Sequence, residues 1–229
     1  VVEIQMRAPR PGLLELLARP ELAIETKQGG TGPFRVKGRK DGALLLQPIA
    51  IPGEEPDQAE LKRRQVHLRG EPADRAVARF ESGQAALVLG GTFADLGVAR
   101  AARLPANALR FDPVAGLFGL AVADAKGFAG TADNRRALSM TIDRDRLLKL
   151  FAVPAWQAAE TLVPPGLGDL PRPAGPDFAS VNLAGRRALA RGTVAAWTAA
   201  GKGLPRVRVA LPPGPGARML FALLRHDWG

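Results

Sequence analysis

The chain of 229 residues contains no cysteine and no tyrosine, and it has only two histidines. Without cysteine there can be no disulfide, no thiolate nucleophile and no zinc or iron–sulfur site held by cysteines. A lone histidine is more often a structural or surface residue than a catalytic base, and we interpret His67 and His226 in this way. The sequence has no Gly-x-Ser-x-Gly motif and no phosphate-binding glycine loop. We therefore expect no catalytic residues, no enzymatic activity and no cofactor.

Long apolar runs are also missing, since none approaches the roughly 20 residues that a membrane-spanning helix needs. The N-terminal stretch VVEIQMRAPRP lacks the basic region, apolar core and cleavage site of a signal peptide. We expect any export signal to lie outside this sequence. What the chain does contain is 46% hydrophobic residues, enough for the core of one large domain or of two ordinary ones.

The formal net charge is +10, and the pI is about 11.1. Cations clustered on one face would point to nucleic acid, whose phosphates they neutralise. Here lysine occupies only seven positions, and the other 25 cations are arginines scattered among alanine, glycine and proline. With three tryptophans and nine phenylalanines, the chain also has few rings that could stack on bases. We therefore expect no nucleic-acid partner.

The first residues predict a helix followed by a hairpin. Residues 11–18 carry leucines at helical spacing and are followed by Pro20, which ends the predicted helix. Polar residues 37–42 separate two strand-like segments, 34–36 and 43–47. We expect these segments to pair, with a loop over residues 48–57.

A strand–helix–strand unit is expected next. Residues 65–69 alternate as a half-buried strand does, and residues 71–82 have helical spacing that Gly83 would end. The apolar run 85–89 is typical of a strand buried on both faces. Such a unit is a right-handed crossover, and ligands gather beyond the carboxyl ends of its strands. Its second strand is followed by Gly90-Gly91-Thr92.

The remaining residues continue this alternation. We expect helices over 93–102, 182–200 and 217–225, strands over 117–122 and 206–211, irregular chain over 104–113 and an extended surface segment over 164–176. An alternating fold would add another strand after the last helix. We therefore expect the chain to end within a domain and to leave an unpaired strand edge and exposed apolar surface.

Residues 133–146, DNRRALSMTIDRDR, predict two helices joined by a tight turn. Asp133 or Asn134 can cap the first helix, and Asp143 can cap the second. Arginines alternate with Asp143 and Asp145, and their charge would neutralise a carboxylate metal site. We expect these charged side chains to cap and brace the corner, and we predict no metal site.

Four segments, in order, are similar to signatures of one protein family. GTGPFRV (30–36) resembles its GTGPY segment, RFESGQAA (79–86) its "sG-E-v-D" signature, residues 134–146 its "vRqAlsyAiDRe" signature, and LVPPG (162–166) its "P-P-G". The family is that of the extracytoplasmic solute-binding proteins of family 5, the oligopeptide-, dipeptide- and nickel-binding proteins of ABC importers. Two positions depart from it: Ala86 replaces an acidic residue, and Gln47-Pro48 replaces an aromatic signature.

The resemblance implies an α/β fold of the periplasmic-binding-protein type (class II, family 5) with two lobes. This chain would hold an incomplete, central part of that fold. Residues 1–113 would belong to the first lobe, and residues 114–229 to the N-terminal part of the second. The resemblance further implies a periplasmic location, a peptide or peptide-like solute, an ABC permease of the inner membrane as partner, and no covalent chemistry.

Two short segments match the family's cleft-facing positions. They are Leu89, Gly90, Gly91 and Thr92 after the expected strand, and Gly116, Leu117, Phe118 and Gly119 beyond the lobe crossover. Because they offer few polar side chains, they would contact the ligand through backbone N–H and C=O groups, as peptide-like ligands permit. The alternative is that the glycines form turns and that Phe118 fills the core.

Two other functions remain open at this stage. The first is a degenerate family member that serves as a protein-interaction or regulatory module, which Ala86 and the lost aromatic signature suggest. The second is nucleic-acid binding through the net positive charge, whose affinity would fall steeply with salt.

Overall fold

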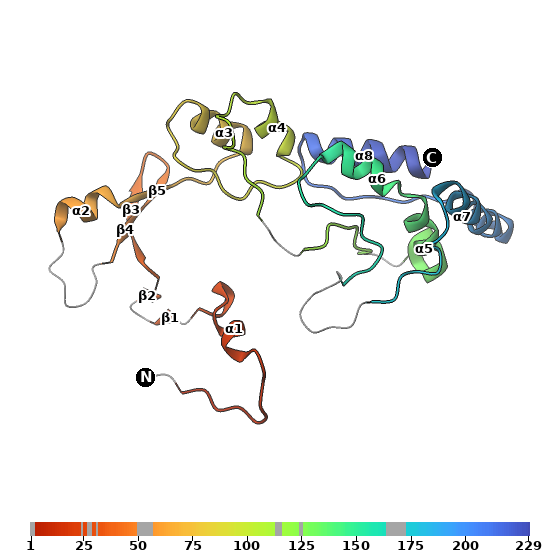
Figure 1. Cartoon of the computed structure of the whole chain (residues 1–229), viewed down its shortest axis with the longest axis horizontal. Helices are drawn as coiled ribbons and strands as arrows, with labels where there is room; N and C mark the ends of the chain where they lie inside the picture. The colour runs from red at the N-terminus through yellow and green to blue at the C-terminus, as the bar shows by residue number, and fades with distance from the viewer. Residues whose placement is uncertain are drawn as a thin grey trace. The chain divides into compact units, whose positions relative to one another are not determined.

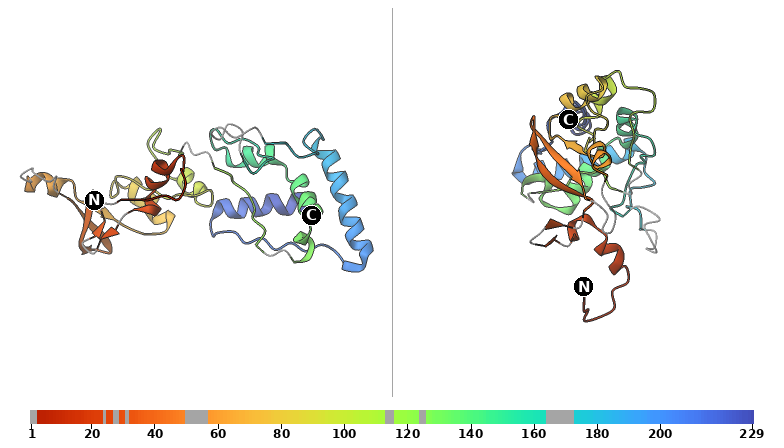
Figure 2. Two further views of the ribbon diagram at one scale, coloured as in Figure 1. Left: turned by 90° about the horizontal axis from the view of Figure 1, so that it is seen from below. Right: turned by 90° about the vertical axis from the view of Figure 1, so that its left-hand side faces the viewer.

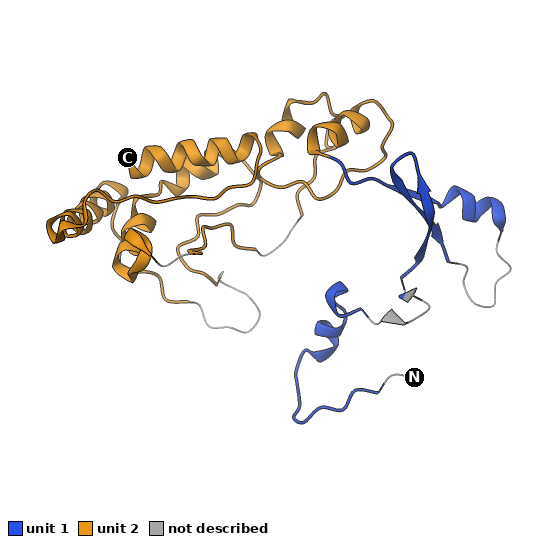
Figure 3. Cartoon of the chain, turned by 180° about the vertical axis from the view of Figure 1, so that it is seen from behind, with its two compact units in different colours: residues 1–71 blue, residues 72–229 orange. Residues whose placement is uncertain are grey.

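The computed structural model describes residues 3–23, 25–26, 29–30, 32–49, 57–112, 116–123, 126–163 and 173–229. The chain divides into two compact units, unit 1 (residues 1–71) and unit 2 (residues 72–229), which Figure 3 shows in different colours. The lobe boundary expected at residues 113 and 114 falls outside the described residues. The division into two lobes therefore stays a prediction.

Unit 1 contains a three-stranded antiparallel sheet of order β3–β4–β5 (Figure 1). The predicted hairpin is confirmed: β3 (Phe34–Lys40) and β4 (Ala43–Pro48) are joined by Asp41 and Gly42, whose φ angles are 49° and 75°. Two consecutive positive φ angles are typical of a type I′ turn, whose twist suits a hairpin. Both strands are longer than predicted, and the turn is correspondingly shorter.

The third strand, β5 (Val66–Leu68), pairs antiparallel with β4 and places His67 opposite Leu45. It is preceded by α2 (Gln58–Arg63), whose first turn is capped by Asp57: its Oδ1 accepts a hydrogen bond from the Ala59 N–H at 2.8 Å. Residues 50–56 of the expected loop lie outside the described residues.

The first thirty residues of unit 1 form short elements. The predicted helix is confirmed as α1 (Leu13–Leu17), which stops at Ala18, two residues before Pro20. It is followed by the 3₁₀ helix η1 (Pro20–Leu22) and by the two-residue antiparallel pair β1 (Glu25–Thr26) and β2 (Gly29–Gly30).

The predicted strand–helix–strand crossover is wrong. Its helix forms as α3 (Ala73–Glu81) and ends before Gly83, which has a φ of 74°, but residues 85–89 form no strand. The strands predicted over 117–122 and 206–211 do not form either. A strand requires a neighbour that takes up its backbone hydrogen bonds. Among the described residues, no segment pairs with any of these three.

Unit 2 is helical in the residues that the structure describes. After α3 come α4 (Leu96–Ala101), the 3₁₀ helix η2 (Gly127–Gly130), α5 (Ala132–Thr141), α6 (Arg144–Phe151), α7 (Leu183–Trp197), the π-helical turn η3 (Thr198–Lys202) and α8 (Pro215–Trp228). Helix α7 packs against α5 and runs across the direction of α8 (Figure 2). None of the described helices is both long and apolar enough to cross a membrane.

Two groups of buried side chains form the core of unit 2. The larger one joins Leu96 of α4 and Phe151 of α6 to Leu220, Leu223 and Leu224 of α8. The smaller one joins α5 to α7 through Ala137, Met140, Phe178 and Ala190. The helices on either side of the α5–α6 turn thus pack into different parts of the core, which holds the corner between them.

The start of α8 lies directly against the chain before α4. The Gly216 N–H donates a hydrogen bond to the Ala94 carbonyl at 3.0 Å, and a Cβ on Gly216 would collide with the Phe93 carbonyl. Gly214 has a φ of 136°, and a Cβ there would lie 2.6 Å from the Ala94 carbonyl oxygen. Only glycine allows this close approach. It holds the backbone of Phe93 and Ala94 against the start of α8.

Candidate solute-binding surface

The first predicted segment, Leu89 to Thr92, lies in the connection between α3 and α4. Leu89 is 78% exposed, and Gly90 has a φ of 79°, so this stretch is a solvent-facing turn. The Thr92 hydroxyl donates to Asp95 Oδ2 at 3.1 Å and accepts from the Ala94 N–H at 3.2 Å. Thr92 therefore stabilises the approach to α4, and its hydroxyl is already engaged.

The second predicted segment, Gly116 to Gly119, is also exposed except for one side chain. Leu117 is 49% exposed, whereas Phe118 is half-buried. Phe118 packs against the core cluster that contains Phe151 and the leucines of α8. The alternative interpretation, in which Phe118 is a core residue, is therefore confirmed with respect to its packing.

The structure brings the two predicted segments together through an aromatic cluster formed by Phe93, Phe118, Phe151 and Trp156. The rings of Phe93 and Phe118 are 4.8 Å apart in an edge-to-face arrangement. Trp156 stacks on Phe118 at 5.2 Å, and the buried Phe151 lies 5.9 Å from Phe93. Such pairs contribute about 0.5–1.5 kcal/mol each beyond the area that they bury. The cluster holds the two segments as neighbours.

Phe93 and Trp156 were not predicted as part of a site. Phe93 directly follows the first segment, so its position beside Thr92 could have indicated from the sequence that it belongs to the site. Trp156 lies between two short apolar segments after α6, and nothing in the sequence connects it with Phe118. The contact between Trp156 and Phe118 depends on how α6 packs against α8, which is a property of the folded chain.

The aromatic cluster is built from parts of the chain that contain no charged residue. The three segments that supply its rings, residues 89–94, 116–122 and 151–159, contain no Asp, Glu, Lys or Arg, although 24% of the chain is charged. Within the described residues, 86–91 and 116–122 make no backbone–backbone hydrogen bond. Among the described residues, this surface therefore offers apolar side chains and backbone N–H and C=O groups that are not part of a helix or a sheet.

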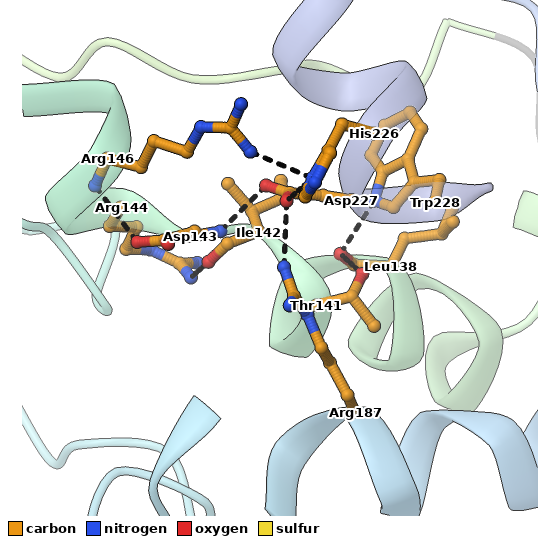
Figure 4. Close-up of polar contacts among 10 residues, drawn as sticks. All are labelled: Leu138, Thr141, Ile142, Asp143, Arg144, Arg146, Arg187, His226, Asp227 and Trp228. Carbon is orange, nitrogen blue, oxygen red and sulfur yellow. Dashed lines mark hydrogen bonds and ion pairs between the residues drawn. The ribbon is translucent and has the colours of Figure 1, made fainter. Parts of the chain in front are cut away.

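The charged segment 133–146 forms the predicted corner between α5 and α6 (Figure 4). Asp143 caps α6 as predicted, because its Oδ1 accepts a hydrogen bond from the Arg146 N–H at 2.9 Å. The predicted cap of α5 is wrong. Thr131 takes that place, and its hydroxyl accepts from the Asn134 N–H at 3.3 Å. Asn134 itself is buried within the first turn of α5.

Asp227, near the end of α8, completes this corner. Its side chain is fully buried, and its Oδ2 accepts a hydrogen bond from the Asp143 N–H at 2.9 Å (Figure 4). Its Oδ1 forms an ion pair of 2.8 Å with Arg187 of α7. The next residue, Trp228, donates from its Nε1 to the Leu138 carbonyl at 3.1 Å. The last turn of α8 therefore links α5, α6 and α7.

Arg144 braces the same corner from the other side. Its guanidinium donates to the Ser139 carbonyl, to the Ser139 hydroxyl and to the Ala159 carbonyl, each at 2.9 Å. Burial lowers the pKa of Arg144 below its ordinary value, Glu160 raises it and Arg186 lowers it further. An arginine remains a cation at neutral pH despite such a shift. The prediction that charged residues cap and brace the corner is confirmed for Asp143, Arg144 and Arg146.

Neither histidine lies in a catalytic arrangement within the described residues. His226 Nδ1 is 2.9 Å from Arg146 Nη1 and 3.1 Å from Asp227 Oδ1, so it belongs to the braced corner. His67 lies exposed on β5. No group of three His, Asp or Glu side chains in the described part of the chain could hold a metal ion.

The aromatic cluster with its two flanking segments is thus the candidate binding surface, and the charged corner is a structural element. No family model, no curated protein and no solved structure matches this chain. Its relation to the solute-binding proteins of family 5 stays a prediction from the four sequence segments.

Proposed function

We propose that this chain is part of the substrate-binding component of an ABC importer, which binds a peptide or peptide-like solute between two lobes and delivers it to a membrane permease. The observation that carries the proposal is the order of the four segments at 30–36, 79–86, 134–146 and 162–166. Each is common by itself, whereas their succession in one chain is specific.

The geometry of unit 2 is compatible with this role. The two segments expected to face a solute, 89–92 and 116–119, are separated by more than twenty residues, yet Phe93 and Phe118 hold them together. Their glycines lie outside helices and strands, and their backbone N–H and C=O groups are of the kind with which an extended peptide is bound. At the α5–α6 corner, Asp143 caps α6 and Arg144 donates to the Ser139 carbonyl, so both side chains are engaged in contacts within the protein. We assign solute binding to backbone groups and apolar side chains of the two segments.

Such a protein works by a closure equilibrium and not by covalent chemistry. A solute that contacts both lobes favours the closed form by the difference in its affinity for the two forms. The permease would then recognise the closed form. The two segments would supply one contact on either side of the lobe crossover.

A thermal-shift screen of the full chain with peptides, amino acids, nickel chelates and sugars tests the proposal. A ligand at a hundred times its Kd stabilises the folded state by about 2.7 kcal/mol, which raises Tm measurably. We expect stabilisation by peptides. A screen in which no compound raises Tm would contradict a solute-binding role.

One observation favours the second candidate, a protein-interaction or regulatory module. Leu87 and Leu89 are 68% and 78% exposed, and apolar side chains gathered on a surface often mark a protein contact. In that case a protein partner, and no small solute, would cover them. Co-purification of a permease complex with the protein would support the importer role against this candidate.

A further inference from the structure

One ring nitrogen of His226 lies between a group that can only donate hydrogen bonds and a group that can only accept them. Its Nδ1 is 2.9 Å from Arg146 Nη1 and 3.1 Å from Asp227 Oδ1 (Figure 4). A guanidinium has donors and no acceptor, whereas an ionised carboxylate has acceptors and no donor. Nδ1 can accept from Arg146 only when it carries no proton, and it can donate to Asp227 only when it carries one. The two hydrogen bonds therefore exclude each other.

The charged groups around this ring, among the described residues, come from three helices: Arg146 and Asp143 from α6, Arg187 from α7 and Asp227 from α8 itself. Arg187 lies 2.8 Å from Asp227 Oδ1, and the Asp143 N–H donates to Asp227 Oδ2. Each carboxylate oxygen has two lone pairs, so Oδ1 can accept from Arg187 and from the ring at once. The Asp143 carboxylate accepts from the Arg146 N–H at the start of α6. The Arg146 guanidinium is therefore the group whose contact depends on the ring's proton.

Protonation of the ring selects between the two hydrogen bonds. Histidine ordinarily changes its charge between about pH 5 and pH 8, and the His226 side chain is 56% exposed, so water reaches it. A protonated ring donates from Nδ1 to Asp227 and presents a like charge to Arg146. A neutral ring with its proton on Nε2 accepts from Arg146 and makes no hydrogen bond to Asp227. Arg146 is exposed, so its guanidinium can exchange the ring for water.

We propose that His226 is a pH-sensitive switch between α6 and α8. In its neutral form the ring holds the Arg146 side chain of α6. Protonation transfers the hydrogen bond of Nδ1 to Asp227 and releases Arg146. The ion pair of Asp227 with Arg187 and the Asp143 cap persist in both forms, so the corner stays folded while one link between the two helices forms or breaks.

A double-mutant cycle of Arg146→Ala and His226→Ala, measured by urea unfolding of the full chain at two pH values, tests this switch. At about pH 8 we expect a favourable coupling that changes the unfolding equilibrium constant by about twofold to fivefold, as for other exposed polar pairs. At about pH 5, where both side chains are cations, this coupling should be lost or become unfavourable. Groups elsewhere that titrate between the two conditions contribute to both sides of the cycle and cancel.

Lys149→Ala combined with His226→Ala is the matched control. Lys149 is an exposed cation of the same helix, and no contact joins it to the ring within the described part of the chain. The effects of these two substitutions should be additive at both pH values. A pH-dependent coupling of equal size in this control pair would show a general charge effect and overturn the switch.

Nitrogen-15 NMR of the histidine rings tests the same switch in the chain without changes at the corner. The only other histidine is His67, so His67→Gln leaves a single ring to observe. We expect the proton on Nε2 at about pH 8 and protons on both ring nitrogens at about pH 5. A proton on Nδ1 at the higher pH, or a coupling with Arg146 that is absent there or persists at the lower pH, would overturn the proposal.

Discussion

The charged corner between α5 and α6 and the aromatic cluster beside it use opposite chemistry. At the corner, the Asp143 N–H, Arg187 and Asp227 are joined by hydrogen bonds and an ion pair of 2.8–2.9 Å, and the Asp227 side chain is fully buried. The segments that supply the rings of the aromatic cluster contain no charged residue of their own, and the charged group that contacts them near Phe151 is Arg100, which donates to the Ala152 carbonyl at 3.0 Å. The polar groups of the corner are paired with one another, whereas the aromatic surface remains open to a partner.

This contrast shows that a conspicuous charged segment need not be a site. Buried charges are tolerated when each has a partner, and the groups that pair them are then no longer available for a ligand. A surface with exposed apolar groups and free backbone donors still has groups available for a ligand. Function in this molecule is therefore to be sought at the uncharged region.

The largest effect is expected at the centre of the aromatic cluster. Phe151 is 2% exposed, so Phe151→Ala should lower the free energy of unfolding by about 4 kcal/mol through lost burial and a cavity. Phe221→Ala on α8, where the ring is 50% exposed, should cost less than about 1 kcal/mol. Urea unfolding monitored by circular dichroism measures both. Similar losses for the two variants would contradict the position of the core.

The next largest loss of stability is expected at the buried ion pair between Asp227 and Arg187. Asp227→Ala leaves Arg187 without its partner and the Asp143 N–H without its acceptor, and we expect a loss of about 3 kcal/mol. Asp177→Ala is the control, because it removes an exposed ion pair with Arg136. Exposed pairs contribute about 0.2–1 kcal/mol. If the two variants unfold at the same urea concentration, the corner does not have the structural role assigned to it.

The sequence predicts elements whose signals are local. Asp143 and Asn182 stand directly before helices and cap them, and the hairpin turn is marked by Asp41 and Gly42. The cap of α5 is missed, because Thr131, Asp133 and Asn134 are all suitable capping residues within four positions. Choosing among them requires knowing that Asn134 is buried.

Features that depend on distant partners could not be predicted in the same way. The apolar run 85–89 has the composition of a buried strand, yet a strand needs a neighbour, and no described segment pairs with it. Asp227 and Arg187 are forty residues apart in sequence, and Trp156 is distant from Phe93. The two predicted binding segments, including Phe118, were named from the sequence, whereas the contacts of Phe118 with Phe93 and Trp156 depend on how the chain packs.

A smaller effect on stability is expected where α8 meets the chain before α4. Gly216→Ala should cost about 2 kcal/mol, because the new Cβ would push against the Phe93 carbonyl and force the backbone to shift. Gly192→Ala within α7 is the control: its Cβ would meet open space, so the better helix former should stabilise by about 0.5–1 kcal/mol. Thermal unfolding distinguishes the two by the opposite signs of their Tm changes.

The smallest effect on stability is expected at the open surface itself. Leu117→Asp changes an exposed side chain that makes no core contact, and the free energy of unfolding should stay within about 0.5 kcal/mol of the original protein. Chemical unfolding measures this directly. A loss of several kcal/mol would mean that Leu117 belongs to the core and is not free to meet a ligand.

The central claim is that the uncharged surface binds and the charged corner only supports it. Titration of Ala-Phe-Ala into the original protein, Leu117→Asp and Arg146→Ala compares the two regions directly, because Arg146 is an exposed residue of the corner that contacts His226. We predict that Leu117→Asp weakens binding at least about tenfold and that Arg146→Ala leaves the affinity unchanged. Loss of binding in Arg146→Ala with normal binding in Leu117→Asp would contradict the account.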